Sequence, residues 1–384
     1  MAVGETAAGS LELGPIRPPS EAYSLLLRVT RNCPWNRCKF CGLYKGQQFE
    51  LRSVDEIKRE IQTVKVIHDQ IKELAGKAGH GNQVAKMAAA VFNNAPSDVY
   101  RQVALWLYAG GRNVFLQDAN TLIMPTDDLV EIIRFLKETF PGIERITSYG
   151  RSKTAARKSL EELKALHDAG LSRLHLGLES GYDPLLAYMN KGVTAAEHIA
   201  GGKKVVASGI SLCEYVILGL GGRKWWREHA AETAKALNEI NPDFIRVRTL
   251  AVNERMPLYR EVANGSFLRA TDEEIVEEEK QLIEHLECSA SFVSDHITNL
   301  LPEIEGKLPE EKEKLLSVIR RFQALPPVER TNFIVGRRAG LYVYMKNLAD
   351  ERRHNAAEQV VRRLTEGNGE VPPQAIYAMM EPFI

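Results

Sequence analysis

The stretch Cys33-Pro34-Trp35-Asn36-Arg37-Cys38-Lys39-Phe40-Cys41 places three cysteines within one short segment. It directly follows the apolar run Leu25-Leu26-Leu27-Arg28-Val29, which predicts a buried strand leading into a loop. Two thiolates separated by two residues can bind one metal centre from a single loop, and the third reaches the same centre if the loop curls. The stretch therefore predicts a metal site at the end of the first strand.

The type of metal site is indicated by the absence of a fourth cysteine or histidine near the three cysteines. A structural zinc site usually takes a fourth cysteine or histidine at similar spacing. The next cysteine in the chain is Cys213, and the nearest histidine, His68, falls in a helical stretch. Three thiolates without a fourth suit a four-iron cluster that keeps one iron open for an outside ligand. Zinc binding and free buried cysteines are the alternatives.

The cysteine loop resembles the cluster loop of the radical S-adenosylmethionine (SAM) superfamily. That superfamily usually has three residues and then two between the cysteines, with an aromatic residue before the last one. Phe40 holds the aromatic position, but the first gap has four residues, Pro34 to Arg37. The resemblance implies that Cys33, Cys38 and Cys41 bind a [4Fe-4S] cluster, on a loop path altered by one residue. An extra loop residue costs little closure entropy.

The composition argues against a nucleic-acid-binding, a disulfide-rich or a membrane-spanning protein. The chain has 384 residues with 50 Lys plus Arg and 50 Asp plus Glu, so its net charge is zero and gives no strong nucleic-acid signal. Five cysteines, three of them in one loop, do not form a disulfide framework and fit a reducing compartment. No apolar run reaches the roughly 18 residues of a membrane span. Residues 1–20 lack a signal pattern, and we expect a flexible arm and a cytoplasmic protein.

The spacing of apolar runs predicts an α/β fold. Six strands are expected at about Leu25–Val29, Val114–Leu116, Arg145–Tyr149, Arg173–Leu178, Leu212–Leu218 and Phe244–Leu250. From the second strand on they recur at roughly thirty-residue intervals between helices, which is typical of βαβ units and a parallel sheet. This spacing does not distinguish an open sheet from a barrel. The radical SAM resemblance, which covers about Leu25 to Val252, implies a six-strand partial (β/α)6 TIM-like barrel.

Three regions follow from this pattern. They are the arm 1–20, a barrel over 21–255 with a helical insertion at about 53–109, and a mostly helical C-terminal extension over 256–384. Within the extension, Ser294 to Leu301 carries several hydrogen-bonding side chains and a histidine. It is either a helix capped by Ser294 or a segment that folds over the mouth of the barrel. In the second case Asp295 or His296 would bind substrate or handle a proton.

Ligands of parallel α/β folds gather at the carboxyl ends of the strands. After the second strand, Asp118-Ala119-Asn120 is similar to the Gly-Gly-Glu of the turn that holds the methionyl ammonium of SAM in the superfamily. Asn120 then stands in the place of the glutamate, which leaves Asp118 as a counter-ion. Arg151, after the third strand, could pair with the methionyl carboxylate. A plain turn and a solvated charge are the structural alternatives.

After the fourth strand, Gly177-Leu178-Glu179-Ser180-Gly181 and the later Lys191-Gly192 resemble a pattern of several radical SAM branches. These include porphyrin-modifying enzymes such as oxygen-independent coproporphyrinogen oxidase. The resemblance implies that Glu179 binds the ribose hydroxyls of SAM, since an unpaired carboxylate at the end of an apolar strand is costly. Leu218 and Gly219, after the fifth strand, resemble the segment that packs on adenine.

On the sixth strand, Arg246 and Arg248 alternate with Ile245 and Val247 and therefore share one face. They are contacts for substrate or SAM if that face is the barrel interior, and surface residues if it is not.

The resemblance implies a radical enzyme. The cluster would pass an electron to SAM and cleave it, and the resulting 5′-deoxyadenosyl radical would abstract a hydrogen atom from a substrate. The partners it implies are a small-molecule substrate and an electron donor such as flavodoxin or ferredoxin. The alternative is an iron–sulfur or electron-transfer protein without SAM cleavage.

Overall fold

The computed structural model describes residues 10–78, 83–365 and 370–380. The chain forms two compact units. Unit 1 contains residues up to Pro34, Gly46–Leu176 and Lys204–Leu212, and unit 2 contains Trp35–Lys45, Gly177–Lys203 and residues from Cys213 onward. The division falls inside the cysteine loop, so that Cys33 belongs to unit 1 while Cys38 and Cys41 belong to unit 2.

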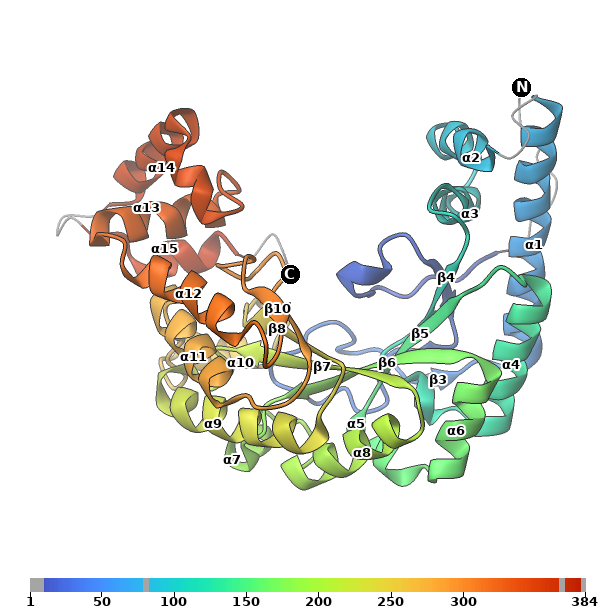
Figure 1. Cartoon of the computed structure of the whole chain (residues 1–384), viewed down its shortest axis with the longest axis horizontal. Coiled ribbons are helices and arrows are strands. Elements are labelled where there is room, and N and C mark those ends of the chain that lie inside the picture. The colour runs from blue at the N-terminus through green and yellow to red at the C-terminus, as the bar shows by residue number, and fades with distance from the viewer. Residues whose placement is uncertain (1–9, 79–82, 366–369, 381–384) are drawn as a thin grey trace. The chain divides into compact units, whose positions relative to one another are not determined.

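Unit 1 is built around parallel strands. Its elements are η1 (Pro19–Glu21), β1 (Leu25–Arg28), β2 (Thr30–Arg31), β3 (Glu50–Leu51), α1 (Val54–Lys77), α2 (Val84–Asn93), α3 (Asp98–Tyr108), β4 (Asn113–Gln117), η2 (Thr121–Ile123), α4 (Thr126–Thr139), β5 (Arg145–Gly150), α5 (Ser152–Arg157), α6 (Leu160–Ala169) and most of β6 (Leu171–Glu179). Strand β4 pairs in parallel with β1 and β5, and β5 pairs with β6. Helices α1 and α4 lie side by side along these strands (Figure 1).

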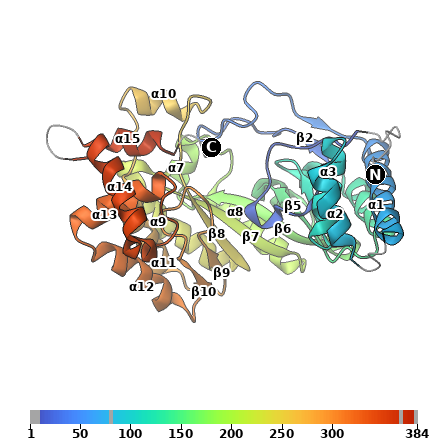
Figure 2. The ribbon, with the colours of Figure 1, turned by 90° about the horizontal axis from the view of Figure 1, so that it is seen from above.

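Unit 2 continues the alternation of strand and helix. Its elements are α7 (Asp183–Tyr188), most of α8 (Ala195–Ala207) and of β7 (Ser211–Leu218), α9 (Gly222–Ile240), β8 (Phe244–Thr249), α10 (Leu258–Ala263), α11 (Asp272–His285), β9 (Ser291–Val293), β10 (Glu305–Lys307), α12 (Lys312–Gln323), α13 (Pro327–Arg338), η3 (Met345–Ala349), α14 (Glu351–Leu364) and α15 (Pro373–Ala378). Strands β7 to β10 lie side by side in chain order (Figure 2).

The fold is therefore α/β with a mostly parallel sheet, and the strand count is the correction to the sequence prediction. All six predicted strands are present, as β1, β4, β5, β6, β7 and β8. The main sheet of the described residues nevertheless has eight strands, because β9 adds in parallel to β8 and β10 adds antiparallel to β9. Each added strand has only three residues, too few to show a period in the sequence.

The core of unit 2 explains the position of its strand ends. Val216, Leu218, Ile245 and Val247 on β7 and β8 are buried against residues of α9 and α11. This packing fixes one face of the strands, so the alternate residues, including Arg246 and Arg248, lie on the other face. Among the helices of the described residues, none has both the length and the apolar character that a membrane crossing needs.

The described part of the predicted N-terminal arm is bound to unit 1. The backbone N–H of Gly14 donates to the side-chain oxygen of Gln117 over 2.9 Å, and the amide of Gln117 donates to the carbonyl of Ile16 over 2.7 Å. The N–H of Glu12 donates to Glu60 over 3.0 Å. These bonds attach residues 12–16 to the end of β4 and to α1.

Candidate functional site

The second half of the cysteine loop is held in unit 2 by backbone bonds on both sides. The N–H of Lys39 donates to the carbonyl of Met189 over 2.9 Å, and the N–H of Leu258 donates to the carbonyl of Lys39 over 3.0 Å. Phe40 is 7% exposed and packs in an apolar cluster that includes Met189 and Leu258. Cys38 and Cys41, which flank this anchored residue pair, are half-buried, and neither is in a disulfide.

Trp35 fixes the start of the same half-loop, which the sequence did not indicate. Its indole N–H donates to the carbonyl of Asn190 over 2.7 Å. Gly192 follows with φ at +71°, and a Cβ built there would lie 2.1 Å from the Trp35 ring. The Lys191-Gly192 pair therefore includes a glycine that the tryptophan requires.

Three thiols of suitable chemistry are thus present in the loop, and none of them is in a disulfide. Within the ranges that the structure describes, no three His, Cys, Asp or Glu side chains are arranged to hold one metal ion. A four-iron cluster takes one thiolate per iron atom, so its ligands do not converge on one point as those of a single ion do. The thiols of Cys33, Cys38 and Cys41, none of them in a disulfide, fit such a cluster in number and kind.

In unit 1, the predicted SAM-ammonium turn is joined to β1 and β5. Asp118 is fully buried, and its carboxylate accepts from Arg28, with Nη2 and Oδ2 2.8 Å apart. The side-chain oxygen of Asn120 accepts from the backbone N–H of Arg151 over 2.9 Å, and its amide donates to Thr154 over 2.9 Å. Asn120 thus links the ends of β4 and β5, whereas Asp118 already has a cationic partner.

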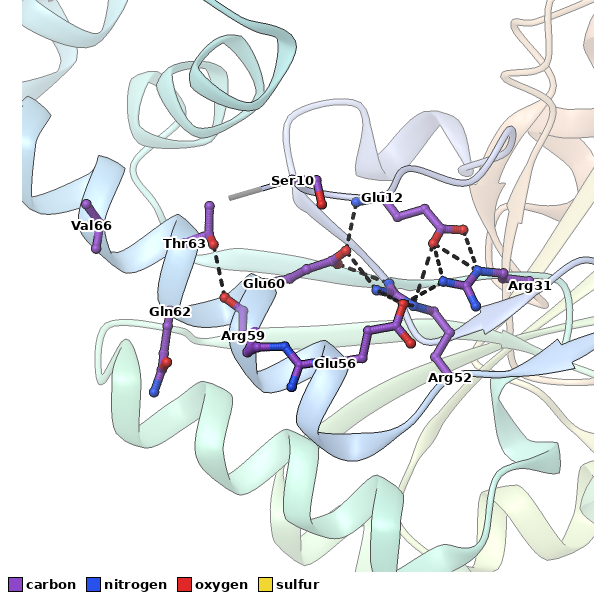
Figure 3. A pocket seen from close by; sticks show the side chains of 10 residues that line it. All are labelled: Ser10, Glu12, Arg31, Arg52, Glu56, Arg59, Glu60, Gln62, Thr63 and Val66. Atoms are coloured by element: carbon purple, nitrogen blue, oxygen red, sulfur yellow. Dashed lines mark hydrogen bonds and ion pairs between the residues drawn. The ribbon is translucent and has the colours of Figure 1, made fainter. Parts of the chain in front are cut away.

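A cavity of about 820 Å³ opens beside this region in unit 1 (Figure 3). Arg52 has a side chain only 1% exposed and binds Glu60 over 2.7 Å and Glu56 over 2.8 Å. Arg31 binds Glu12 over 2.6 Å, and this hydrogen-bonded pairing lowers the pKa of Glu12 below its usual value. Most charged groups of the cavity are therefore paired with one another and serve to hold the N-terminal segment.

In unit 2, Glu179 ends β6 beside a lysine. The Lys191 ammonium lies 2.9 Å from Oε1 of Glu179, and both side chains are largely buried, with 10% and 13% exposed. Glu179 has φ at +63°, in the left-handed region that non-glycine residues rarely adopt. Strain of this kind is concentrated at functional positions, which agrees with a role for Glu179 as a ligand-binding residue.

Glu214 on β7 is a buried carboxyl group that sequence reasoning missed inside an apolar run. It is fully buried, and neither of its oxygens has a hydrogen-bond partner in the described residues. Burial raises its pKa well above the usual value, and Glu179 raises it further against the opposing effect of Lys191. Glu214 is therefore a buried carboxyl group with a raised pKa beside the Glu179–Lys191 pair.

A buried network supports the predicted adenine-packing residues. The N–H of Gly219, which follows Leu218 at the end of β7, donates to Oε1 of Glu278 over 2.9 Å. Nε2 of His229 lies 3.1 Å from the carbonyl of Ile217 and 3.4 Å from the same Glu278 oxygen. Burial is the main cause that lowers the pKa of His229 to about 4, so the imidazole is neutral.

The segment after β9 packs on the end of β8, and residues 294–301 contain no helix, contrary to the capped-helix alternative. Asn299 fixes it: its side-chain oxygen accepts from the N–H of Thr249 over 2.7 Å, and its amide donates to the carbonyl of Val247 over 2.9 Å. This brings Asp295 within 3.4 Å of Arg246. Asp295 and His296 thus lie with the two β8 arginines, within unit 2.

Comparison with known proteins gives one matching family. The sequence pattern of the Radical SAM superfamily matches residues 94–234, a range that includes Asp118, Arg151, Glu179 and Gly219 but not the cysteine loop. That superfamily comprises enzymes that use a [4Fe-4S] cluster and SAM, so the match supports an enzyme with these cofactors.

One curated relative is the tRNA-2-methylthio-N(6)-dimethylallyladenosine synthase of Syntrophus aciditrophicus (strain SB), 30% identical over 158 residues. The match covers 38% of this chain and only a third of that relative. Among solved structures, the Elp3 of Methanocaldococcus infernus gives a TM-score of 0.43 at 15% identity, covering 62% of this chain and 61% of that one. The coproporphyrinogen III oxidase HemN of Escherichia coli gives 0.42 at 17% identity, covering 68% and 51%.

Proposed function

We propose that this chain is a radical SAM enzyme built on a partial barrel. The observation that carries the proposal is the order of the signals, because each stands at the end of its own strand. The cysteines come after β1, Asp118 to Asn120 follow β4, Arg151 follows β5, Glu179 ends β6 and Gly219 follows β7. Ligand-binding residues of parallel α/β folds come from such strand ends. The match to the Radical SAM superfamily over residues 94–234 supports the same reading.

In this proposal Cys33, Cys38 and Cys41 hold the cluster, and Phe40 anchors the loop between the last two thiolates. Asn120 orders the backbone around Arg151, whose guanidinium binds the methionyl carboxylate of SAM. Because Arg28 already pairs with Asp118, that carboxylate serves the SAM ammonium only together with Arg28. When bound there, the cluster and SAM would supply the radical chemistry of hydrogen-atom abstraction, and these residues would hold and orient them.

Glu179 accepts hydrogen bonds from the ribose hydroxyls, and its ion pair with Lys191 holds the carboxylate in place. The backbone of Leu218 and Gly219 packs on the adenine, with Gly219 held in place by Glu278. The two β8 arginines contact SAM or substrate. We place the protein in the cytoplasm with a small-molecule substrate and a flavodoxin- or ferredoxin-like electron donor, and the Gly-Leu-Glu-Ser-Gly motif favours the porphyrin-modifying branch.

The test is production of 5′-deoxyadenosine. The chain is reconstituted anaerobically with iron and sulfide, reduced, and incubated with SAM. We expect 5′-deoxyadenosine from the wild type and none from Cys38→Ala. A protein that binds a four-iron cluster, is reduced, and releases no 5′-deoxyadenosine would instead be an electron-transfer protein. In that event the radical SAM proposal fails.

A further inference from the structure

Two arginines on β8 face the residues of its neighbour strand in unit 2. In the β7–β8 register, Arg246 lies opposite Tyr215 and Arg248 lies opposite Ile217. Arg246 is 11% exposed, and its charge is met by Asp295 at 3.4 Å. Tyr215 also interacts electrostatically with Arg246. The first arginine therefore has partners from two elements.

Arg248 differs from its neighbour. It is half-buried, and no hydrogen bond or ion pair engages its guanidinium anywhere in the described ranges. Its Nε is buried and lacks an acceptor. Burial of a charged donor without an acceptor costs free energy that a fully solvated arginine would not lose. The Arg248 guanidinium can therefore bind an acceptor group from a ligand.

The charges around Arg248 define that partner. The Asp295 carboxylate pairs with Arg246, and no carboxylate of the described residues pairs with Arg248, which leaves one positive charge uncompensated. His296 does not change this count, because burial and the two arginines lower its pKa to about 4 and leave it neutral. A group with a single negative charge balances the site, and a planar carboxylate matches the guanidinium fork.

We propose that Arg248, assisted by Arg246, binds a carboxylate group of the substrate. This inference rests on the proposed function, since it names the substrate class of that enzyme. It makes the substrate a carboxylic acid and gives Arg248 a specificity-determining role. SAM also carries a carboxylate, so the experiment must distinguish the two sources.

The probe is trifluoroacetate, a monocarboxylate that stays ionised and is observed by ¹⁹F NMR. The full-length chain, prepared anaerobically, is titrated with it, and acetate is used as competitor. We expect saturable binding to the wild type, weakened about tenfold or more in Arg248→Gln, because a charge-assisted bidentate pair is lost. The matched control is Arg260→Gln, which removes an exposed arginine of the same unit and should bind as the wild type.

Arg248→Lys is a second variant that distinguishes loss of binding from misfolding. It keeps the positive charge but lacks the two parallel N–H donors of the guanidinium. We expect it to bind more weakly than the wild type and more tightly than Arg248→Gln. Equal binding by wild type and Arg248→Gln, or no saturable binding to the wild type, overturns the proposal.

The second arm measures SAM affinity by equilibrium dialysis. If Arg248 serves the substrate, SAM binds equally to the wild type and Arg248→Gln. If SAM affinity falls about tenfold while decarboxylated SAM binds both proteins equally, Arg248 holds the cofactor's carboxylate and the substrate proposal is wrong. If the chain makes no 5′-deoxyadenosine but binds trifluoroacetate through Arg248, the proposed radical SAM activity is wrong and the carboxylate-binding site is still supported.

Discussion

The Lys191 ammonium lies 2.9 Å from Oε1 of Glu179, and this pair occupies the end of β6 in unit 2. A Cβ built on Gly177 would lie 2.3 Å from the same Glu179 oxygen and 3.0 Å from the lysine nitrogen. The glycine two residues before Glu179 thus provides the space in which the carboxylate and its lysine meet. The glycine of the Gly-Leu-Glu motif therefore has a steric reason.

We predict that Glu179→Ala weakens SAM binding while iron content is unchanged. The variant loses a charged acceptor for the ribose hydroxyls, which costs roughly 1.5–3 kcal/mol, or about ten- to hundredfold in affinity. Equilibrium dialysis with SAM measures the loss. Glu232→Ala, which removes a half-exposed glutamate of the same unit, is the control. Unchanged SAM affinity in Glu179→Ala would remove this residue from the site.

The three loop cysteines should be separable from the other two by iron content. Cys33→Ala, Cys38→Ala and Cys41→Ala should each lose the cluster, because each removes one thiolate ligand. Cys213→Ala and Cys288→Ala should keep it, since both residues are buried in unit 2, 2% and 5% exposed. Iron and sulfide assays after anaerobic reconstitution make the comparison. Loss of iron in Cys213→Ala equal to that in Cys38→Ala would contradict a three-cysteine cluster.

Gly192→Ala should disturb the cysteine loop without unfolding the chain. The added methyl group would overlap the Trp35 ring, so the loop residues after Cys33 must shift. Gly265→Ala is a close control, because Gly265 has φ at +77° against +71° for Gly192 and nothing within 4 Å of an added Cβ. Both variants carry the backbone strain, and only Gly192→Ala displaces Trp35. We expect lower iron content in Gly192→Ala alone; equal iron in both variants would mean that the Trp35 contact does not support the loop.

The sequence predicted best the features that repeat locally. Ser159–Glu162 and Thr271–Glu274 have the sequence spacing of a capping box and form capping boxes in the structure, because this motif involves residues only three apart. Ser53 and Glu56 have the same spacing, and Ser53 caps α1, but the Glu56 carboxylate binds Arg31 and Arg52. Such a choice between partners depends on residues distant in the chain, which one sequence does not reveal.

In the candidate functional site, too, contacts between residues distant in the chain could not be predicted from the sequence. The order of signals after β1, β4, β5, β6 and β7 could be read from the sequence, since strand ends follow from apolar runs. The pairing of Arg28 with Asp118 spans 90 residues and could not. Glu214 and Glu278 were also missed, because a carboxyl group in a strand or amphipathic helix gives no sign that it is buried.

The buried Glu278 should make stability depend on pH. Burial raises its pKa to about 8 from the usual 4.5, and Glu279 beside it contributes to the rise. Between pH 4.5 and pH 8 the unfolded chain has released this proton while the folded chain retains it. The folded state then binds more protons, so the free energy of unfolding falls as pH rises through this window. The slope is about 1.4 kcal/mol per pH unit for one such group.

Urea titrations at pH 6.5, 7.25 and 8 measure this slope. His229 titrates with the opposite sign, since its pKa is lowered from 6.5 to about 4, but it contributes little above pH 6.5. Glu279, whose pKa burial also raises to about 8, adds a second falling contribution. Glu278→Gln keeps an oxygen for the Gly219 N–H and cannot ionise, so it should lose the part of the slope that Glu278 contributes and gain stability over the wild type as pH rises. The control Glu273→Gln alters a half-exposed carboxylate paired with Arg330 and should run parallel to the wild type. Equal slopes for wild type and Glu278→Gln would show that this carboxyl group is already ionised in the folded chain.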